Sequence, residues 1–263
     1  MTIVGERRQH RLDIGLDDLE LSQAFDEAAR RYDLMVALNP GYHRQLASAA
    51  RILAEQVDGR NGRVRLLDLG CGSGASTRAL VQVFRRERRP ADIIGADASP
   101  GMLERARRKS WPPRVRFQQV FAQQLSTSRH DLGLTDPVDG VLAAYLFRNV
   151  AQRDETLDAV WDVLRPGGTL VVQEYSVEGS RAADLTWTLV CWLVVIPLSL
   201  LTSRRSSLYR YLWRSVRRFD SVQGFVDRLY RAGFIDVEVR TAKGWQRGIL
   251  HTFRARKPDQ VGS

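Results

Sequence analysis

The chain has 263 residues, of which 44% are hydrophobic, and its 40 lysines and arginines against 30 aspartates and glutamates give a formal charge of +10. This length fits one large domain, or one domain with an inserted segment. Two cysteines leave no framework for disulfides or zinc, so we expect no metal site and a reducing compartment. The positive charge predicts an acidic partner, either a nucleic acid or an anionic membrane surface.

The first elements expected along the chain are helical. Residues 1–20 are rich in charge and lack the apolar core of a signal peptide, so we expect a mobile basic arm and no secretion. Apolar residues at helical spacing follow at 21–35 and at 42–57, separated by the turn signal Asn39-Pro40-Gly41. These patterns predict two leading helices.

The rest of the chain alternates between short apolar runs and helical patterns. Helices are expected at 99–109, opened by Ser99 as N-cap, and at 152–168, closed by Pro166 and Gly167. Strands that alternate with helices predict an α/β fold with a parallel, doubly wound sheet. The last two runs have no helix between them and predict an antiparallel hairpin that completes it. The expected strands are 64–70, 92–97, 114–120, 138–145, 168–175, 234–241 and 249–257.

A glycine-rich loop, "RLLDLGCGSGAST" at 65–77, follows the first expected strand. Gly70, Gly72 and Ala75 satisfy the dinucleotide fingerprint G-x-G-x-x-G/A. The same loop satisfies the acidic-x-G-x-G-x-G pattern of S-adenosylmethionine enzymes through Asp68, Gly70, Gly72 and Gly74. A loop between strand and helix offers backbone amides and a close approach to a polar ligand of either kind.

Two carboxylates bear on that choice. Asp97 ends the second expected strand, where a carboxylate accepts the ribose hydroxyls of either nucleotide. Asp68 would repel a pyrophosphate, but it would attract the ammonium and sulfonium of S-adenosylmethionine. The loop therefore favours S-adenosylmethionine over a dinucleotide. The alternative is a purely structural role, in which Asp68 only caps a turn.

Several further segments appear in a family's order: "AFDEAARRYDLM", "LLDLGCGSG", "YLFRNV", "VLRPGGTLVVQEYS", "YRYL" and "RAGF". Through them the chain resembles the ubiquinone/menaquinone-biosynthesis C-methyltransferases from about Ala24 to Arg254. The glycine loop and "LRPGG" are common to many class I methyltransferases, whereas "FRNV" with "YDLM" and "YRYL" is much narrower. The resemblance implies a Rossmann-like, seven-stranded class I fold and methyl transfer from S-adenosylmethionine to the ring carbon of a prenylated quinol at the membrane.

The resemblance also implies roles for individual residues. S-adenosylmethionine would lie over the three loop glycines, with Asp97 on the ribose, Met102 against the adenine and Asp68 at the amino-acid end. Tyr32 and Asp33 match a segment that closes over the donor, which makes the N-terminal region a lid. Core packing is the alternative for Tyr32.

Arg148 and Asn149 follow the fourth expected strand, at the carboxyl edge where open α/β sheets bind ligands. We expect Arg148 to stabilise the phenolate of the acceptor while water or a nearby group takes the proton. A surface salt bridge is the alternative. Glu174 ends the fifth expected strand at the same edge, and His43 and His251 are candidate bases or structural histidines.

One stretch departs from the family. Phe121-Ala122-Gln123 stands after the third expected strand, where the family usually carries an acidic adenine contact. We expect Gln123 or backbone amides to contact the adenine instead. This departure is what a divergent paralogue would carry.

An uncharged stretch at 185–201 lies where the family places its acceptor cap. A spanning helix needs roughly 20 apolar residues, and Pro197 interrupts this one. We rank a cap that lies on the membrane first, a buried helix second and a span third. Trp187 and Trp192 suit an interface, and the arginines that follow suit an anionic surface: Arg204, Arg205, Arg210, Arg214, Arg217 and Arg218.

We therefore expect contact with an anionic membrane through 185–218, no nucleic-acid partner, and a cytoplasmic protein peripherally attached to the inner face of the membrane. The leading hypothesis is a methyltransferase for a lipidic or aromatic acceptor. A soluble small-molecule O-methyltransferase and a non-catalytic protein of the same fold are the alternatives. The expected segments are an arm at 1–20, a lid at 21–58, a donor-binding core at 59–178, a cap at 179–219, a C-terminal helix and strands at 220–256, and a tail at 257–263.

Overall fold

The computed structural model describes residues 41–58, 62–130, 132–134, 136–195 and 207–259. Tyr32, Asp33, Arg204 and Arg205 lie outside the described residues, as do the arm, the first leading helix and the second part of the uncharged stretch.

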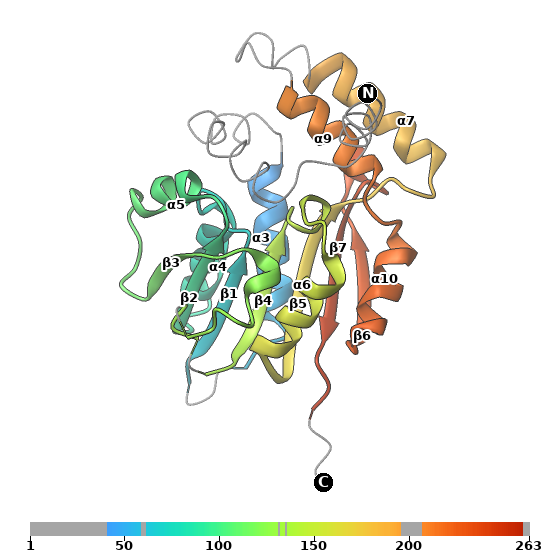
Figure 1. Ribbon diagram of the computed structural model, residues 1–263. Coiled ribbons are helices and arrows are strands. Elements are labelled where there is room, and N and C mark those ends of the chain that lie inside the picture. The colour runs from blue at the N-terminus through green and yellow to red at the C-terminus, as the bar shows by residue number, and fades with distance from the viewer. Residues whose placement is uncertain (1–40, 59–61, 131, 135, 196–206, 260–263) are drawn as a thin grey trace, which may run out of the picture.

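A seven-stranded sheet forms the centre of the molecule, in the order β3-β2-β1-β4-β5-β7-β6 (Figure 1). Strands β1 to β5 pair in parallel, and β7 pairs antiparallel with both β5 and β6. The expected strands and the terminal hairpin are therefore confirmed. Their bounds are β1 Val64–Leu69, β2 Ala91–Asp97, β3 Val115–Gln119, β4 Val138–Ala144, β5 Leu164–Tyr175, β6 Ile235–Thr241 and β7 Leu250–Arg256.

The start of β5 differs from the prediction. We expected helix 152–168 to close at Pro166 and Gly167, but it ends at Val163, and Leu164 already pairs with Val138 of β4. Between Val138 and Gly140 the register shifts, because Pro166 lacks an N–H and Gly167 has a φ of +72°. The "LRPGG" segment is thus a bulged strand entry and not a helix end.

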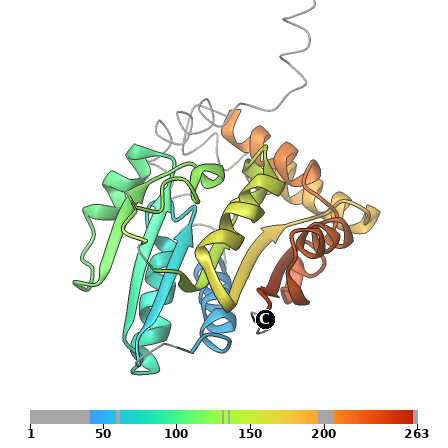
Figure 2. The same ribbon diagram turned by 60° about the horizontal axis from the view of Figure 1, so that its bottom comes forward.

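Helices cover both faces of the sheet (Figure 2). Helices α3 and α4 pack on one face in a core that includes Leu46 and Leu80, and α6 and α10 pack on the other in a core that includes Leu157 and Phe225. The second leading helix is therefore α3, a layer of the main core within the segment expected as a lid. The helices are α3 Tyr42–Ala54, α4 Ala75–Arg86, α5 Pro100–Arg107, α6 Arg153–Val163 and α10 Val222–Arg231.

The cap lies beyond the carboxyl edge of the sheet, at the top of Figure 1. Its described elements are α7 (Arg181–Val190), a π-helical turn (Cys191–Val195) and α9 (Ser207–Arg217). Ser180 caps α7 by accepting from the Ala183 amide at 3.3 Å. Within the part of the chain that the structure describes, no helix is long and apolar enough to cross a membrane.

Candidate functional site

Asp97 ends β2 and is held by two backbone amides. Its Oδ2 accepts from the Gly72 amide at 2.8 Å, and its Oδ1 accepts from the Ser99 amide at 2.9 Å. The first bond ties the glycine loop to β2, and the second precedes α5, which Ser99 caps by accepting from the Met102 amide at 3.1 Å. The predicted N-cap is confirmed, and the carboxylate stands where the loop and two strands meet.

The three loop glycines meet different surroundings. Gly70 and Gly72 line the pocket above the sheet edge, whereas Gly74 caps α4 outside it. A Cβ at Gly72 would have no described residue within 4 Å, but a Cβ at Gly74 would lie 2.8 Å from the Trp111 ring. Gly72 therefore leaves room for a ligand, while Gly74 makes room for Trp111.

Asp68 lies beneath the loop and is fully buried. Its Oδ2 accepts from the Ser76 hydroxyl at 2.8 Å and from the Thr77 hydroxyl at 2.5 Å, both in the first turn of α4. Its Oδ1 accepts no hydrogen bond from the residues that the structure describes. Burial raises the pKa of this carboxyl from 3.8 to about 7, against the lowering effect of the two hydroxyls. A cationic ligand group would satisfy the unpartnered oxygen.

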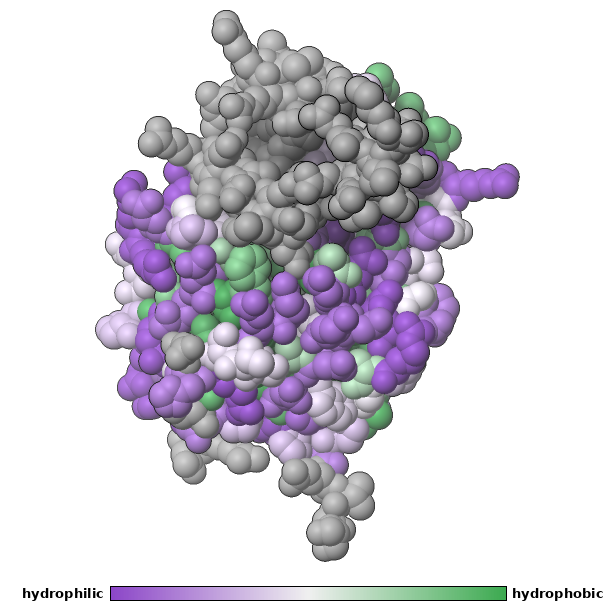
Figure 3. All heavy atoms as spheres, viewed as in Figure 1, coloured by the Kyte–Doolittle hydropathy of each residue, from purple (hydrophilic) through white to green (hydrophobic). Residues whose placement is uncertain are grey.

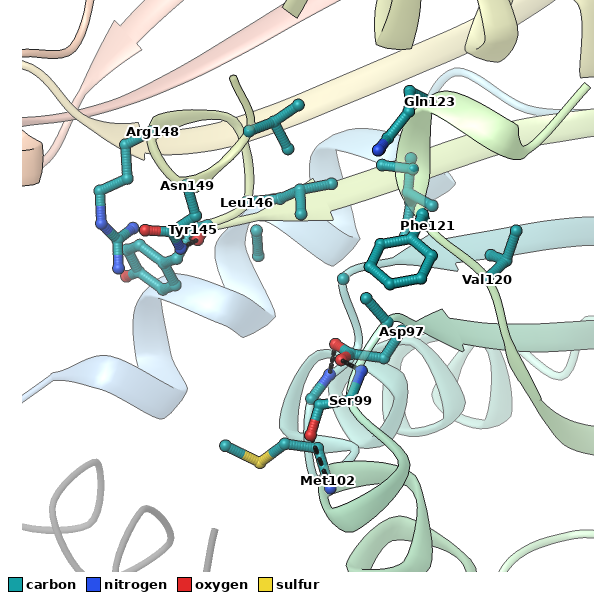
Figure 4. Close-up of a pocket in the computed structure, with 17 residues that line it drawn as sticks. Asp97, Ser99, Met102, Val120, Phe121, Gln123, Tyr145, Leu146, Arg148 and Asn149 are labelled. Carbon is teal, nitrogen blue, oxygen red and sulfur yellow. Dashed lines mark hydrogen bonds between the residues drawn. The ribbon is translucent and has the colours of Figure 1, made fainter. Parts of the chain in front are cut away.

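The pocket has three sides (Figure 4). Asp97, Ser99 and Met102 form one, and Val120, Phe121 and Gln123 follow β3 on the second. Tyr145, Arg148 and Asn149 form the third side, with Leu146 between them and the glycine loop. The structure therefore brings together in one pocket the predicted residues Gly70, Gly72, Asp97, Met102, Gln123, Arg148 and Asn149. The predicted residues Asp68 and Gly74 do not line it.

Arg148 is ion-paired with Glu174. Its Nη1 lies 2.6 Å from Glu174 Oε1 and 3.1 Å from the Tyr145 carbonyl, and its amide donates to Glu174 Oε2 at 3.2 Å. The Glu174 side chain is fully buried and that of Arg148 is 9% exposed. Arg148 and Glu174, which we expected as separate residues at this edge, form one buried ion pair. The Glu174 carboxylate therefore largely balances the charge of the Arg148 guanidinium.

Tyr145 organises this third side, and sequence reasoning missed it. Its φ of +59° is in the left-handed region, which costs a non-glycine residue roughly 1–2 kcal/mol. In that conformation its carbonyl accepts from both Arg148 and Asn149, the second at 3.0 Å from Asn149 Nδ2. Its ring stacks on Tyr42 at 5.5 Å and on Tyr175 at 5.2 Å. An aromatic directly after a strand was the available signal.

The cap reaches the site through Tyr211, within the "YRYL" segment. Its hydroxyl donates to Asn149 Oδ1 at 3.2 Å. Trp187 of α7, which is buried, stacks on Tyr175 with ring centres 5.1 Å apart. Both cap helices therefore contact the residues that surround Arg148.

Neither of the two candidate histidines lines the pocket. His251 is buried opposite Glu174 in the β5–β7 pairing, and burial lowers its pKa. His43 is exposed on α3 beside Tyr42. Of the described residues that line the pocket, none is a histidine.

The sheet order, the hairpin and the pocket at the carboxyl ends of β1 to β4 define a class I S-adenosylmethionine-dependent methyltransferase. A solved S-adenosylmethionine-dependent methyltransferase from Thermotoga maritima superimposes with a TM-score of 0.57 at 18% identity, over 89% of this chain and 98% of that one. At this identity the likeness concerns the fold alone.

The chain belongs to the ubiE/COQ5 methyltransferase family, whose model matches residues 14–257. It is 31% identical to the demethylmenaquinone methyltransferase of Clavibacter sepedonicus, over 94% of each chain. It is 28% identical to the ubiquinone/menaquinone biosynthesis C-methyltransferase UbiE of Pseudomonas aeruginosa, over 91% of this chain and 89% of that one. S-adenosylmethionine is thus its cofactor, and the protein is an enzyme.

The residues present fit that cofactor. A ribose requires an acceptor such as the Asp97 carboxylate at the end of β2, and a close backbone approach requires a glycine such as Gly72, near which no described side chain or backbone would meet a Cβ. An ammonium requires an acceptor such as Asp68 Oδ1, which is buried and has no partner among the described residues. Phe121 and Gln123, which stand where an acidic adenine contact was expected, both line the pocket.

Proposed function

We propose that this protein methylates a ring carbon of a lipidic quinol at an anionic membrane surface. The names of its relatives, demethylmenaquinone methyltransferase and ubiquinone/menaquinone biosynthesis C-methyltransferase, support that class of acceptor. The observation that carries the proposal is the continuity of one pocket from Asp97 and Met102, our donor side, to Tyr145, Arg148 and Asn149, our acceptor side.

The donor supplies an electrophilic methyl group on a sulfonium, so the protein has to position a nucleophile in line with it. A quinol ring carbon is a weak nucleophile until a ring hydroxyl loses its proton. We assign Arg148 and Asn149 to that ring oxygen, because both line the acceptor side and both are oriented by the Tyr145 carbonyl.

Arg148 cannot itself take the proton, since arginine stays protonated in proteins. Glu174 is also a poor base, because it is fully buried and accepts from the Arg148 side chain and from the Arg148 and Tyr175 amides. We therefore assign the hydroxyl proton to water in the pocket. When the ring carbon bonds the methyl group and the bond from methyl to sulfur breaks, the ring C–H proton also leaves to water and the ring oxygen regains a proton. Balancing the guanidinium with Glu174 leaves Arg148 to act through directed hydrogen bonds more than through net charge.

The cap supports the membrane part of the proposal. Leu185 and Leu193 are 61% and 70% exposed. Leu185 lies on α7, whose Trp187 stacks on Tyr175, and Tyr175 stacks on Tyr145 of the acceptor side. Exposed leucines on a helix followed by arginines are typical of an interfacial segment. Cys71 and Cys191 are both unpaired and buried, which supports placement on the cytoplasmic face.

Labelled S-adenosylmethionine, with a prenylated demethylated quinol and its tailless analogue, tests the proposal. We expect a ring-methylated product that keeps both hydroxyls, and a lower KM for the prenylated acceptor. A product methylated on oxygen would make the protein an O-methyltransferase. Equal KM values for the prenylated acceptor and its tailless analogue would contradict the proposal that the natural acceptor is lipidic.

A further inference from the structure

A second pocket lies at the outer end of the cap, where the start of α7 meets the last turn of α9. Arg217 Nε donates to Asp184 Oδ1 at 2.6 Å, and Trp213 Nε1 donates to Thr188 Oγ1 at 3.2 Å. Because these contacts pair later residues of one helix with earlier residues of the other, α7 and α9 run antiparallel. The end of α9 thus faces the beginning of α7.

Arginines dominate the charge of this pocket. Its charged lining consists of Arg181, Arg214, Arg217 and Arg218 against Glu178 and Asp184. Arg217 is paired with Asp184 and lies 4.9 Å from the centre of the Trp213 ring. In the described structure the side chains of Arg181, Arg214 and Arg218 have neither an ion pair nor a hydrogen bond. Clustered guanidinium groups without acidic partners match a phosphate, which they bind through paired N–H donors.

An apolar stripe continues from this pocket along α7 and into the π-helical turn that follows it. Leu185, Leu189 and Trp192 follow Arg181 at intervals of four, four and three residues, so all four side chains share one helix face. The three apolar side chains are 61%, 48% and 47% exposed. In Figure 3, hydrophobic atoms follow the outer edge of the molecule over α7. One helix face thus carries a guanidinium at one end and apolar side chains along the rest. This order matches a lipid monolayer, in which the charged headgroups lie next to the acyl chains.

We propose that this arginine pocket seats the phosphate of an anionic phospholipid while the stripe of Leu185, Leu189 and Trp192 enters the acyl boundary. The inference deepens the membrane contact proposed above and rests on it. Phospholipid is favoured over free phosphate or nucleic acid because neither of these would use the stripe. With α7 in the interface, the acceptor side of the catalytic pocket, at the same edge of the sheet, faces the bilayer.

Co-sedimentation with phosphatidylcholine vesicles containing phosphatidylglycerol tests the pocket. Each arginine near an anionic surface contributes about fivefold to partitioning, so Arg214→Gln with Arg218→Gln should weaken it about 25-fold. The matched control is Arg85→Gln with Arg86→Gln, which removes the same charge from the exposed last turn of α4, at the opposite edge of the sheet. We expect this control to change partitioning by less than about threefold. If both double variants weakened partitioning equally, the arginine pocket would not be the lipid-binding site.

Two further experiments are needed. A competition experiment distinguishes a phospholipid from other sources of phosphate, and an activity assay distinguishes failure of the lipid site from failure of the proposed function. Inorganic phosphate, glycerol phosphate and a single-stranded oligonucleotide are added as competitors, and lipid specificity is overturned if any of them displaces the protein at a concentration matched in phosphate. Activity on a detergent-solubilised quinol should be unchanged in Arg214→Gln with Arg218→Gln. If the unmodified protein binds vesicles through the pocket but methylates no quinol, the proposed function fails and the lipid site stands. If it methylates the quinol but the double variant sediments normally, the lipid site fails alone.

Discussion

Arg148 and Glu174 form a buried ion pair at the carboxyl edge of the sheet, with 2.6 Å between Nη1 and Oε1. Removing one partner of such a pair typically costs about 3–5 kcal/mol, because the other charge stays buried without compensation. Arg148→Ala should therefore lower the free energy of unfolding by about that amount, as well as slowing turnover. Chemical denaturation and a turnover assay on the same sample measure the two effects.

A double variant separates them. Arg148→Met with Glu174→Gln removes both charges, so it should recover most of the lost stability while turnover stays low. Loss of one oriented contact to a developing oxyanion typically costs about 2.7–4 kcal/mol in the barrier. Recovery of turnover together with stability would show that the pair is structural and that Arg148 does not contact the acceptor.

Asp97→Ala should weaken S-adenosylmethionine binding by at least about tenfold, because hydrogen bonds to a charged group contribute roughly 1.5–3 kcal/mol. The variant also leaves the Gly72 and Ser99 amides without their acceptor. Asp92→Ala, near the other end of β2, is the control: Asp92 is partly exposed and pairs with Arg114. Titration calorimetry compares the affinities for S-adenosylmethionine. A similar loss of affinity in both variants would show that Asp97 does not contact the donor.

Gly72→Ala and Gly74→Ala should fail in different ways, although both residues have a positive φ, +53° and +91°. Each alanine costs roughly 1–2 kcal/mol of backbone strain. At Gly74 the Cβ also lies 2.8 Å from Trp111, so we expect the larger loss of stability there. At Gly72 we expect the larger loss of donor affinity, because we place the donor in the space above Gly72 that no described residue fills. Thermal unfolding with and without donor distinguishes the two, and a Gly72→Ala protein with normal donor affinity would contradict the assignment.

Asp68 should make donor binding depend on pH. With a pKa of about 7, Asp68 gains its charge as the pH rises from 5.5 to 7, while an amino group of ordinary pKa, near 8, stays protonated. Affinity for the cationic donor should therefore rise about tenfold over this range, and Asp68→Asn should bind it more weakly and without that rise. Calorimetry across the range measures this. A flat profile in the unmodified protein would place Asp68 away from the donor charge.

The same carboxyl predicts a stability change of opposite sense. Because its pKa is raised above 3.8 in the folded state, the folded state holds the proton more tightly than the unfolded chain does. Its contribution to stability is therefore lost as the pH rises from about 4 to 7, and Asp68→Asn should reduce that loss.

The sheet and the donor loop could be predicted because their signals are local. Alternating apolar runs, the glycine spacing at Gly70 and Gly72, and the cap at Ser99 each lie within a few residues, where strand, loop and helix propensities act. The start of β5 was missed because Pro166 and Gly167 signal a helix end as readily as a strand bulge. Only the pairing of Leu164 with Val138 distinguishes the two.

The acceptor side depends on contacts between distant parts of the chain. The pair of Arg148 and Glu174 joins residues 26 apart, and the bond from Tyr211 to Asn149 joins residues 62 apart. The sequence placed Arg148 and Glu174 at the same edge of the sheet and so suggested a site there. It did not show whether the Arg148 side chain faces solvent or the Glu174 carboxylate, because that depends on how β4 and β5 align. The left-handed Tyr145 is held by the rings of Tyr42 and Tyr175 and by the hydrogen bonds of its carbonyl, and no local pattern encodes the ring packing. Residue identity and short-range periodicity therefore determined the fold and the donor loop, while the balance of charge around the acceptor came from the packing of strands and helices remote in sequence.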